Sequence, residues 1–113
     1  MKYVIDATGE RVGRIASKVA VILQGKMSPA YERRLSGTDR VLVTNAGKVS
    51  FSGGKFETNV YHRHTGYMGH LRKKPMKTVF NENPEDVLRR AVYNMLPKNR
   101  LRTGRLKRLA VER

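Results

Sequence analysis

The basic residues of this 113-residue chain are concentrated in two long blocks that contain no acidic residue. The first block runs from Thr58 to Asn81 and holds five Lys and Arg residues, and the second runs from Val87 to Val111 and holds eight. Blocks of like charge repel one another and do not pack together in a core. The sequence therefore predicts that the cations of both blocks face a polyanion.

The overall charge agrees with a polyanionic partner. The chain has 24 Lys and Arg against 9 Asp and Glu, which gives a formal net charge of +15. Nucleic acid is the favoured partner and an anionic membrane the weaker alternative. No apolar stretch approaches the roughly 20 residues that span a bilayer, and a strand-like run begins the chain without a signal peptide before it. The absence of cysteine excludes disulfides and thiolate chemistry. We expect a cytoplasmic, nucleic-acid-binding protein.

Short β-branched runs alternate with helical periodicities along the chain. Helices are predicted at about 14–24 and 76–81 and within 83–97, and strands at 3–6, 40–46 and 57–64. In the last helix Asn83 is the expected cap, Pro84 suits the first turn, and Glu85 and Asp86 complement the positive end of the helix dipole. This order predicts a single α/β domain over residues 1–113, with a mainly parallel sheet and right-handed crossovers.

Catalytic and metal sites are not expected. His62 and His64 project from one face of a predicted strand and His70 follows, but a fourth ligand is missing. The segment TGERVG after the first strand has two glycines at the wrong spacing for a dinucleotide loop. The acidic residues cannot be combined into a convincing Ser-His-Asp triad or carboxylate pair. We therefore expect no metal, no cofactor, no small-molecule substrate and no enzymatic activity.

Aromatic residues are interspersed in the first basic block, where they could stack on unpaired bases. For Phe80 a core position is the favoured interpretation, whereas for Tyr67, which lies between glycines, stacking and core positions are both open. In residues 100–109 the basic side chains surround the helical wheel instead of gathering on one face, which argues against a membrane-surface helix. We expect residues 97–109 to be poorly ordered without RNA and to form a short helix on binding it. Alanine at Arg102, Arg105 and Arg108 should then leave stability nearly intact.

Several motifs, in this order, resemble the bacterial type of the ribosomal protein L13 family of the large subunit. They are YVIDATGERVGRIAS, LQGK, VLVTNAGKVSFSGGK, YHRHTGYMG and NMLP, and the resemblance extends from about Tyr3 to Val111. It implies a three-layer α/β/α sandwich around a four-stranded, mainly parallel sheet, with a basic C-terminal segment at about 97–113. It also implies a non-catalytic protein of the large ribosomal subunit that binds large-subunit rRNA directly, supports its folding and early assembly, and has other ribosomal proteins as neighbours.

The resemblance also implies which residues contact rRNA. Glycines would let the backbone approach a phosphate closely, and arginines would bind phosphates in a bidentate manner. The competing interpretation is a DNA-binding or nucleoid-type basic protein. Against it, the sequence shows no helix-turn-helix spacing, and Glu85 and Asp86 would repel phosphate at the N-terminus of the best helix. The expected rRNA contacts are Arg63, His64, Gly66, Tyr67, Gly69, Arg72, Lys73, Lys74, Lys98, Arg100, Arg102, Arg105, Lys107 and Arg108.

Overall fold

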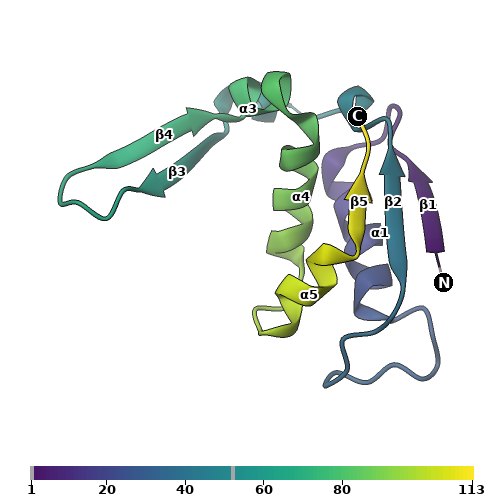
Figure 1. The fold of residues 1–113 in the computed structure, drawn as a ribbon. Coiled ribbons are helices and arrows are strands. Elements are labelled where there is room, and N and C mark those ends of the chain that lie inside the picture. Colours follow the sequence, from purple (N-terminus) through teal and green to yellow (C-terminus); the bar gives the residue numbers. More distant parts are fainter. Residues whose placement is uncertain (1, 52) are drawn as a thin grey trace.

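The computed structural model describes residues 2–51 and 53–113 and shows a small α/β body from which a β-hairpin projects (Figure 1). In chain order the elements are β1 (Lys2–Asp6), α1 (Val12–Gln24), β2 (Arg40–Thr44), the 3-10 helix η1 (Ala46–Lys48), α2 (Lys55–Thr58), β3 (Val60–His64), β4 (Leu71–Pro75), α3 (Met76–Glu82), α4 (Pro84–Met95), α5 (Leu101–Lys107) and β5 (Leu109–Val111).

The sheet of the body has three parallel strands in the order β1-β2-β5. The prediction of four strands is wrong, because β3 pairs antiparallel with β4 in a separate two-stranded sheet. The physical reason lies in the composition of these strands. All of β4 is exposed, and in β3 only Tyr61 is partly buried, so neither strand has the apolar side chains that a covered parallel strand requires. The region predicted as one strand at 57–64 also begins inside α2.

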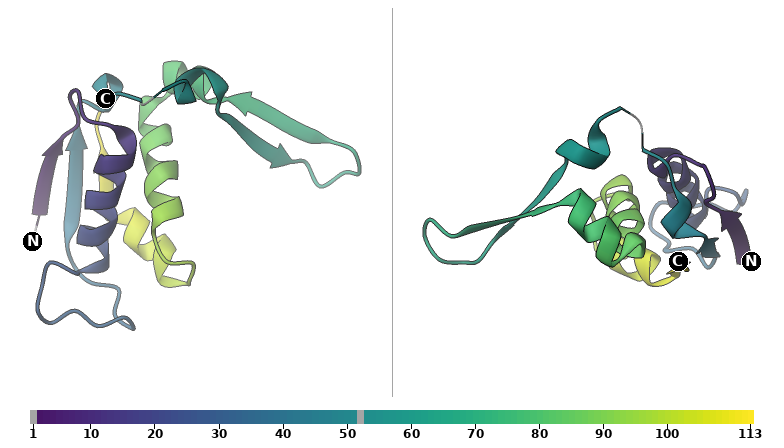
Figure 2. Two further views of the ribbon diagram at one scale, coloured as in Figure 1. Left: turned by 180° about the vertical axis from the view of Figure 1, so that it is seen from behind. Right: turned by 90° about the horizontal axis from the view of Figure 1, so that it is seen from above.

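Helices cover one face of the three-stranded sheet. Val41 and Val43 of β2 point to this face and are buried in one cluster with Ile15, Val19 and Leu23 of α1. The opposite face is largely open, and its residue Val4 is 64% exposed. The expected three-layer sandwich is therefore not formed by the described residues, which make two layers. Figure 2 shows α4 beside α1 and next to the β5 edge. None of the described helices is long and apolar enough to span a membrane.

The two long helices lie close to their predicted positions. Helix α1 ends at Gly25, whose φ of 84° is the left-handed conformation that glycine adopts without a steric penalty. Helix α4 has Pro84 as its first residue and both Glu85 and Asp86 in its first turn. Its apolar stripe contributes Leu88, Val92 and the following Leu96 to the core. The predicted cap is not formed, since Asn83 makes no side-chain capping bond within the described chain.

The basic C-terminal segment is folded, so the expectation of a poorly ordered tail is wrong. Strand β5 extends the parallel sheet, and its residues Leu109 and Val111 belong to the core. Arg105 in α5 is only 2% exposed. Its guanidinium donates hydrogen bonds to the Ser36 carbonyl at 3.3 Å and the Leu35 carbonyl at 3.0 Å. The buried guanidinium of Arg105 thus donates its hydrogen bonds to backbone carbonyls and not to RNA.

Arg108 fastens the same loop from a second position. It donates hydrogen bonds to the carbonyl oxygens of Asp39 at 2.7 Å, Leu23 at 2.9 Å and Ser36 at 2.5 Å. Burial, and secondarily the charge of Arg105, lowers the pKa of Arg108 from its ordinary value. The Leu23 carbonyl belongs to the last turn of α1, where a cation also complements the helix dipole. Together the two arginines bind α5 to the loop of residues 25–39, and we call them the arginine clasp.

Asp6 connects the ends of the first two strands. Its Oδ1 accepts hydrogen bonds from the Thr8 backbone N–H at 2.9 Å, the Thr8 hydroxyl at 2.7 Å and the Asn45 amide at 3.0 Å. The bond from the Thr8 N–H is the largest of the effects that lower the pKa of this carboxyl from 3.8 to about 2. These bonds join the turn after β1 to the residue that follows β2.

This carboxylate should contribute a pH-dependent part of the stability. Because its pKa is lowered in the folded state, its contribution is complete above the ordinary pKa of 3.8 and is lost as the pH falls toward about 2. Urea unfolding of the wild type and of Asp6→Asn should give a constant difference in unfolding free energy between about pH 5 and 7. That difference should shrink as the pH is lowered from about 4 to 2. A difference that stays the same down to pH 2 would show that the ionised carboxylate is not stabilised in the turn.

Candidate nucleic-acid interface

The β3–β4 hairpin projects from the body (Figures 1 and 2), and it carries most of the cations of the first basic block. Arg63, Arg72, Lys73 and Lys74 are all exposed, as are His62 and His64. Since these side chains bury little surface against the rest of the protein, packing does not explain their presence. The hairpin can therefore be brought against a second molecule without disturbing the core.

The hairpin register places like charges opposite one another. Arg63 lies across from Arg72, and His62 lies across from Lys73. Successive residues of a strand point to opposite faces, so both faces of the hairpin carry positive charge. Like charges directly opposite one another destabilise an antiparallel pair. An external anion between Arg63 and Arg72 would remove this repulsion. The pairing therefore favours the interpretation that the hairpin binds phosphates.

The tip of the hairpin is a compact loop that presents two apolar side chains to solvent. The backbone of His70 closes the loop: its carbonyl accepts a hydrogen bond from the Thr65 N–H at 3.1 Å, and its N–H donates one to the Tyr67 carbonyl at 3.2 Å. Gly66 and Gly69 have φ values of 89° and 74°, which only glycine adopts freely. Tyr67 is 74% exposed and Met68 is 97% exposed. A core position for Tyr67 is thereby excluded, and its ring is available for stacking.

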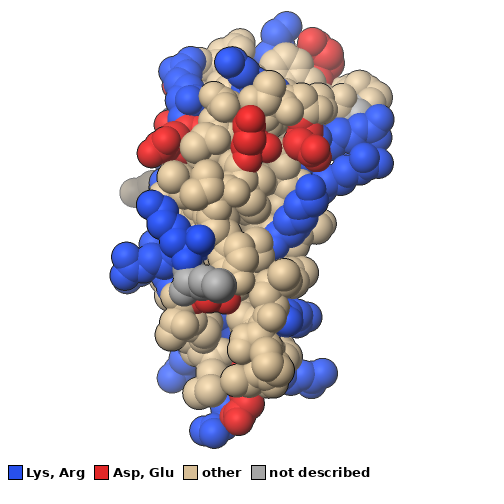
Figure 3. All heavy atoms as spheres, turned by 90° about the vertical axis from the view of Figure 1, so that its right-hand side faces the viewer, with Lys and Arg blue, Asp and Glu red and all other residues tan. Residues whose placement is uncertain are grey.

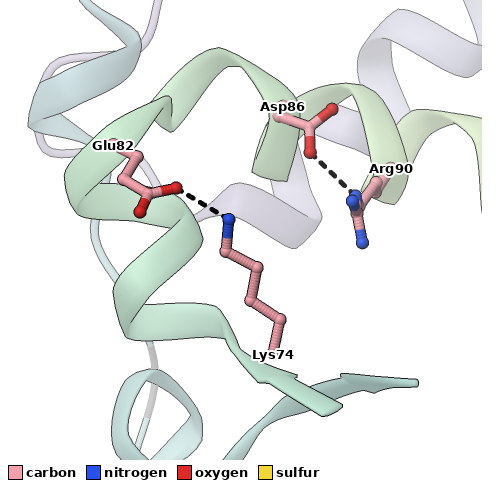
Figure 4. Close-up of polar contacts among 4 residues, drawn as sticks. All are labelled: Lys74, Glu82, Asp86 and Arg90. Atoms are coloured by element: carbon pink, nitrogen blue, oxygen red, sulfur yellow. Dashed lines mark hydrogen bonds and ion pairs between the residues drawn. The ribbon is translucent and has the colours of Figure 1, made fainter. Parts of the chain in front are cut away.

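The base of the hairpin is fixed to the body. The Arg90 guanidinium lies 4.4 Å from the centre of the Tyr61 ring and is bonded to Asp86 at 2.9 Å. Lys74 forms an ion pair of 2.7 Å with Glu82 (Figure 4). Burial raises the pKa of Tyr61 above its ordinary value, so the phenol stays neutral at physiological pH. Phe80 packs with Phe51 and Phe56, which confirms its expected core position.

The second basic block is divided between the surface and the interior. Lys98, Arg100 and Lys107 are exposed, and no ion pair is recorded for them in the described chain. The Arg102 guanidinium lies 3.8 Å from the centre of the Tyr93 ring and is bonded to the Tyr93 hydroxyl at 2.6 Å. The expected phosphate contacts of Arg105 and Arg108 do not fit this conformation, because their guanidinium groups are engaged in the arginine clasp.

Sequence reasoning missed basic residues outside the two blocks. Lys26 and Arg33, from the loop of residues 25–39, line one hollow together with Pro97 and Asn99. They therefore extend the surface formed by the second block. These residues gave no clear signal because Glu32 and Asp39 make the loop mixed in charge, and a mixed run is typical of an ordinary solvated surface. Figure 3 shows the molecule from the side of strand β1, and Lys and Arg side chains lie along both margins of this face.

The histidines of the hairpin do not gather into a metal site. Among the described residues there is no group of three or more His, Asp or Glu side chains that could hold a metal ion. The His64 ring instead accepts a hydrogen bond on Nδ1 from the Gly66 N–H at 3.0 Å. This bond gives His64 a local role in shaping the loop.

Comparisons of the sequence with known proteins place this chain in a family. The profile of the family described as Ribosomal protein L13 matches residues 1–111. The chain is 42% identical over 109 residues to the large ribosomal subunit protein uL13 of Chloroflexus aggregans, covering 96% of this chain and 76% of that protein. It is 43% identical over 109 residues to the uL13 of Rubrobacter xylanophilus, with the same coverage of the two chains. It is 48% identical over 99 residues to the uL13 of Gemmatimonas aurantiaca, covering 88% of this chain and 66% of that protein.

Proposed function

Since the chain belongs to the ribosomal protein L13 family, we propose that it is a structural constituent of the large ribosomal subunit and binds large-subunit rRNA directly. The family consists of structural ribosomal proteins, and the chain is not an enzyme. In this role the protein acts in the cytoplasm as part of the subunit, with rRNA and neighbouring ribosomal proteins as its partners. Binding helps the rRNA to fold during early assembly.

The β3–β4 hairpin carries this proposal. It is held at its base by the Lys74–Glu82 ion pair and by the contact of Arg90 with the Tyr61 ring, while its strands and tip expose basic side chains, two left-handed glycines and the Tyr67 ring. Phosphates would bind between the basic side chains of the strands, and Tyr67 would stack on an unpaired base. The glycines at 66 and 69 leave the backbone open to close approach by a phosphate. The proposed contacts on the hairpin are Arg63, His64, Gly66, Tyr67, Gly69, Arg72, Lys73 and Lys74.

The exposed part of the second block forms a second contact region. Lys98, Arg100 and Lys107 are free to bind phosphate, and Arg102 can do so from its position over Tyr93. We assign Arg105 and Arg108 to the arginine clasp instead of to RNA. The hairpin and this region lie on different parts of the molecule (Figure 1), so RNA bound at both would be held at two separate places.

Binding to rRNA should depend strongly on salt. Each neutralised phosphate contributes about −0.7 to −0.9 to the slope of log K against log salt. With five or more phosphates bound, filter binding with a large-subunit rRNA fragment should give a slope of about −4 or steeper. Duplex DNA of the same length, as the control, should bind more weakly at every salt concentration. A slope shallower than about −2, or equal affinity for duplex DNA, would contradict the proposal.

A further inference from the structure

A cleft lies where the base of the hairpin meets α1 and α4. Its volume is about 240 Å³, and Gly13, Phe51, Asn59, Tyr61, Arg90 and Asn94 are among its lining residues. A second hollow of about 260 Å³ adjoins it, since the two share Val12, Gly13, Phe51 and Lys55. Pockets for drug-sized ligands usually measure about 300–1,000 Å³. The cleft is therefore suited to a smaller group, of the size of one nucleobase.

The lining of the cleft fits a flat ring with a polar edge. Phe51 and Tyr61 are partly buried aromatic residues that belong to the same apolar cluster. Asn59 and Asn94 add side-chain amides, each with donors and an acceptor. Asn94 is exposed and makes no side-chain hydrogen bond in the described structure, while the Asn59 amide has only a 3.9 Å contact with the Met76 sulfur. Both amides can therefore bond to the edge of an incoming base.

The charge around the cleft fits the backbone of a nucleic acid. The adjoining hollow is lined by Arg11, Arg14 and Lys55. No acidic residue is among the described residues that line either hollow. A nucleotide whose base enters the cleft would leave its phosphates at the adjoining hollow, where these cations can neutralise them. A paired base could not enter, because its edge and both its faces are covered in a duplex.

We propose that this cleft binds a single unpaired base of the rRNA, stacked on Phe51 beside Tyr61 and bonded at its edge by Asn59 and Asn94, with the flanking phosphates at Arg11, Arg14 and Lys55. The inference rests on the proposed function, since it assigns a base-binding site for the same RNA at a place whose lining residues are not among the contacts proposed above. The site uses residues from α1, β3 and α4, so it exists only in the folded chain.

Two pairs of variants test the cleft without disturbing the fold. Asn94→Leu removes the amide, and its control Asn81→Leu makes the same change at an exposed helical position that does not line the cleft. Gly13→Leu puts a side chain at the cleft, where an added Cβ would have no atom within 4 Å, and its control Gly13→Ala adds only that Cβ. Both changes at position 13 should favour the α1 helix. With a large-subunit rRNA fragment, each leucine variant at 94 or 13 should bind about ten-fold more weakly, and each control should bind like the wild type.

An abasic scan of the same fragment identifies the bound base. Removing one particular unpaired base should weaken wild-type binding about ten-fold and should not weaken Gly13→Leu binding further, because the base and the cleft act as a pair. If Gly13→Leu binds like the wild type, or if no abasic position shows this coupling, the cleft is not a base-binding site, although the hairpin proposal still stands. If the wild type shows no salt-dependent binding to rRNA, the proposed function fails and this inference fails with it.

Discussion

Replacing Arg105 and Arg108 together with alanine is expected to lower the free energy of unfolding by about 4 kcal/mol. The double variant leaves four carbonyl oxygens, those of Leu23, Leu35, Ser36 and Asp39, without their guanidinium donors. A buried polar group left without its partner costs about 1–3 kcal/mol, and water will reach some of these carbonyls. For a domain of this size the loss should lower the melting temperature by roughly 15 °C, which calorimetry or thermal circular dichroism will measure.

Two control variants separate the arginine clasp from a general effect of charge. Arg100→Ala removes an exposed cation just before α5 and should change the unfolding free energy by less than about 0.5 kcal/mol. Arg108→Lys keeps the charge but loses the forked geometry that reaches three carbonyls, so it should remain destabilised. If the double variant is as stable as the wild type and loses only rRNA affinity, the two arginines contact RNA and the clasp assignment is wrong.

The clasp also shows why the long loop of residues 25–39 can be ordered. A stretch of this length without regular structure is uncommon in a compact domain, because its backbone groups need partners. Here the two arginines supply several of those partners from α5 and the residue after it. At Gly37 the φ of +80° brings the loop close to Arg108, since an added Cβ would lie 3.6 Å from its Nη1. A basic segment and a distant loop thus stabilise each other.

The sequence predicted those elements whose own side chains determine their burial. The strands at 3–6 and 40–46 and the helices at 14–24 and 83–97 all have a clear apolar pattern, and each is found near its predicted position. Strand β5 was missed because its three residues follow directly after Lys107 and Arg108, and so short an apolar run gives little signal. Strand β4 was missed because LRKKP has no strand-like alternation. Its pairing with β3 depends on backbone hydrogen bonds, which periodicity does not reveal.

The candidate site was predicted as a set of residue types, and only the structure separates their roles. Arg102, Arg105 and Lys107 lie within one helix of seven residues, yet one cation covers a tyrosine ring, one is buried and one is exposed. The surroundings of the three side chains differ because of two partners outside α5. These are the loop of residues 25–39, which is distant in the sequence, and Tyr93, which belongs to α4. Local sequence cannot show such contacts. In the hairpin, by contrast, local sequence was sufficient, because the basic residues of this acid-free segment are all exposed.

The largest effect on RNA binding is expected from the hairpin. Changing Arg63, Arg72 and Lys73 together to glutamine should weaken binding to a large-subunit rRNA fragment by roughly a thousand-fold. The three charged contacts contribute about 1.5 kcal/mol each at the lower end of the usual range, and about 4.1 kcal/mol corresponds to that factor. The slope of log K against log salt should become shallower by about 2 to 3, since three fewer phosphates are neutralised. Filter binding over a series of salt concentrations measures both quantities.

The same triple variant should not be less stable than the wild type. Arg63 and Arg72 face each other across the hairpin, so removing their charges relieves a repulsion instead of breaking a contact. A matched control changes Lys2, Lys18 and Lys48 to glutamine, which lowers the net charge by the same amount at exposed positions on the body. If binding depended only on net charge, both triple variants would lose the same affinity, and the hairpin would not be a distinct interface. Because the hairpin side chains bury so little surface in the protein, we expect their loss to weaken RNA binding far more than the control changes do, while the melting temperature stays unchanged or rises slightly.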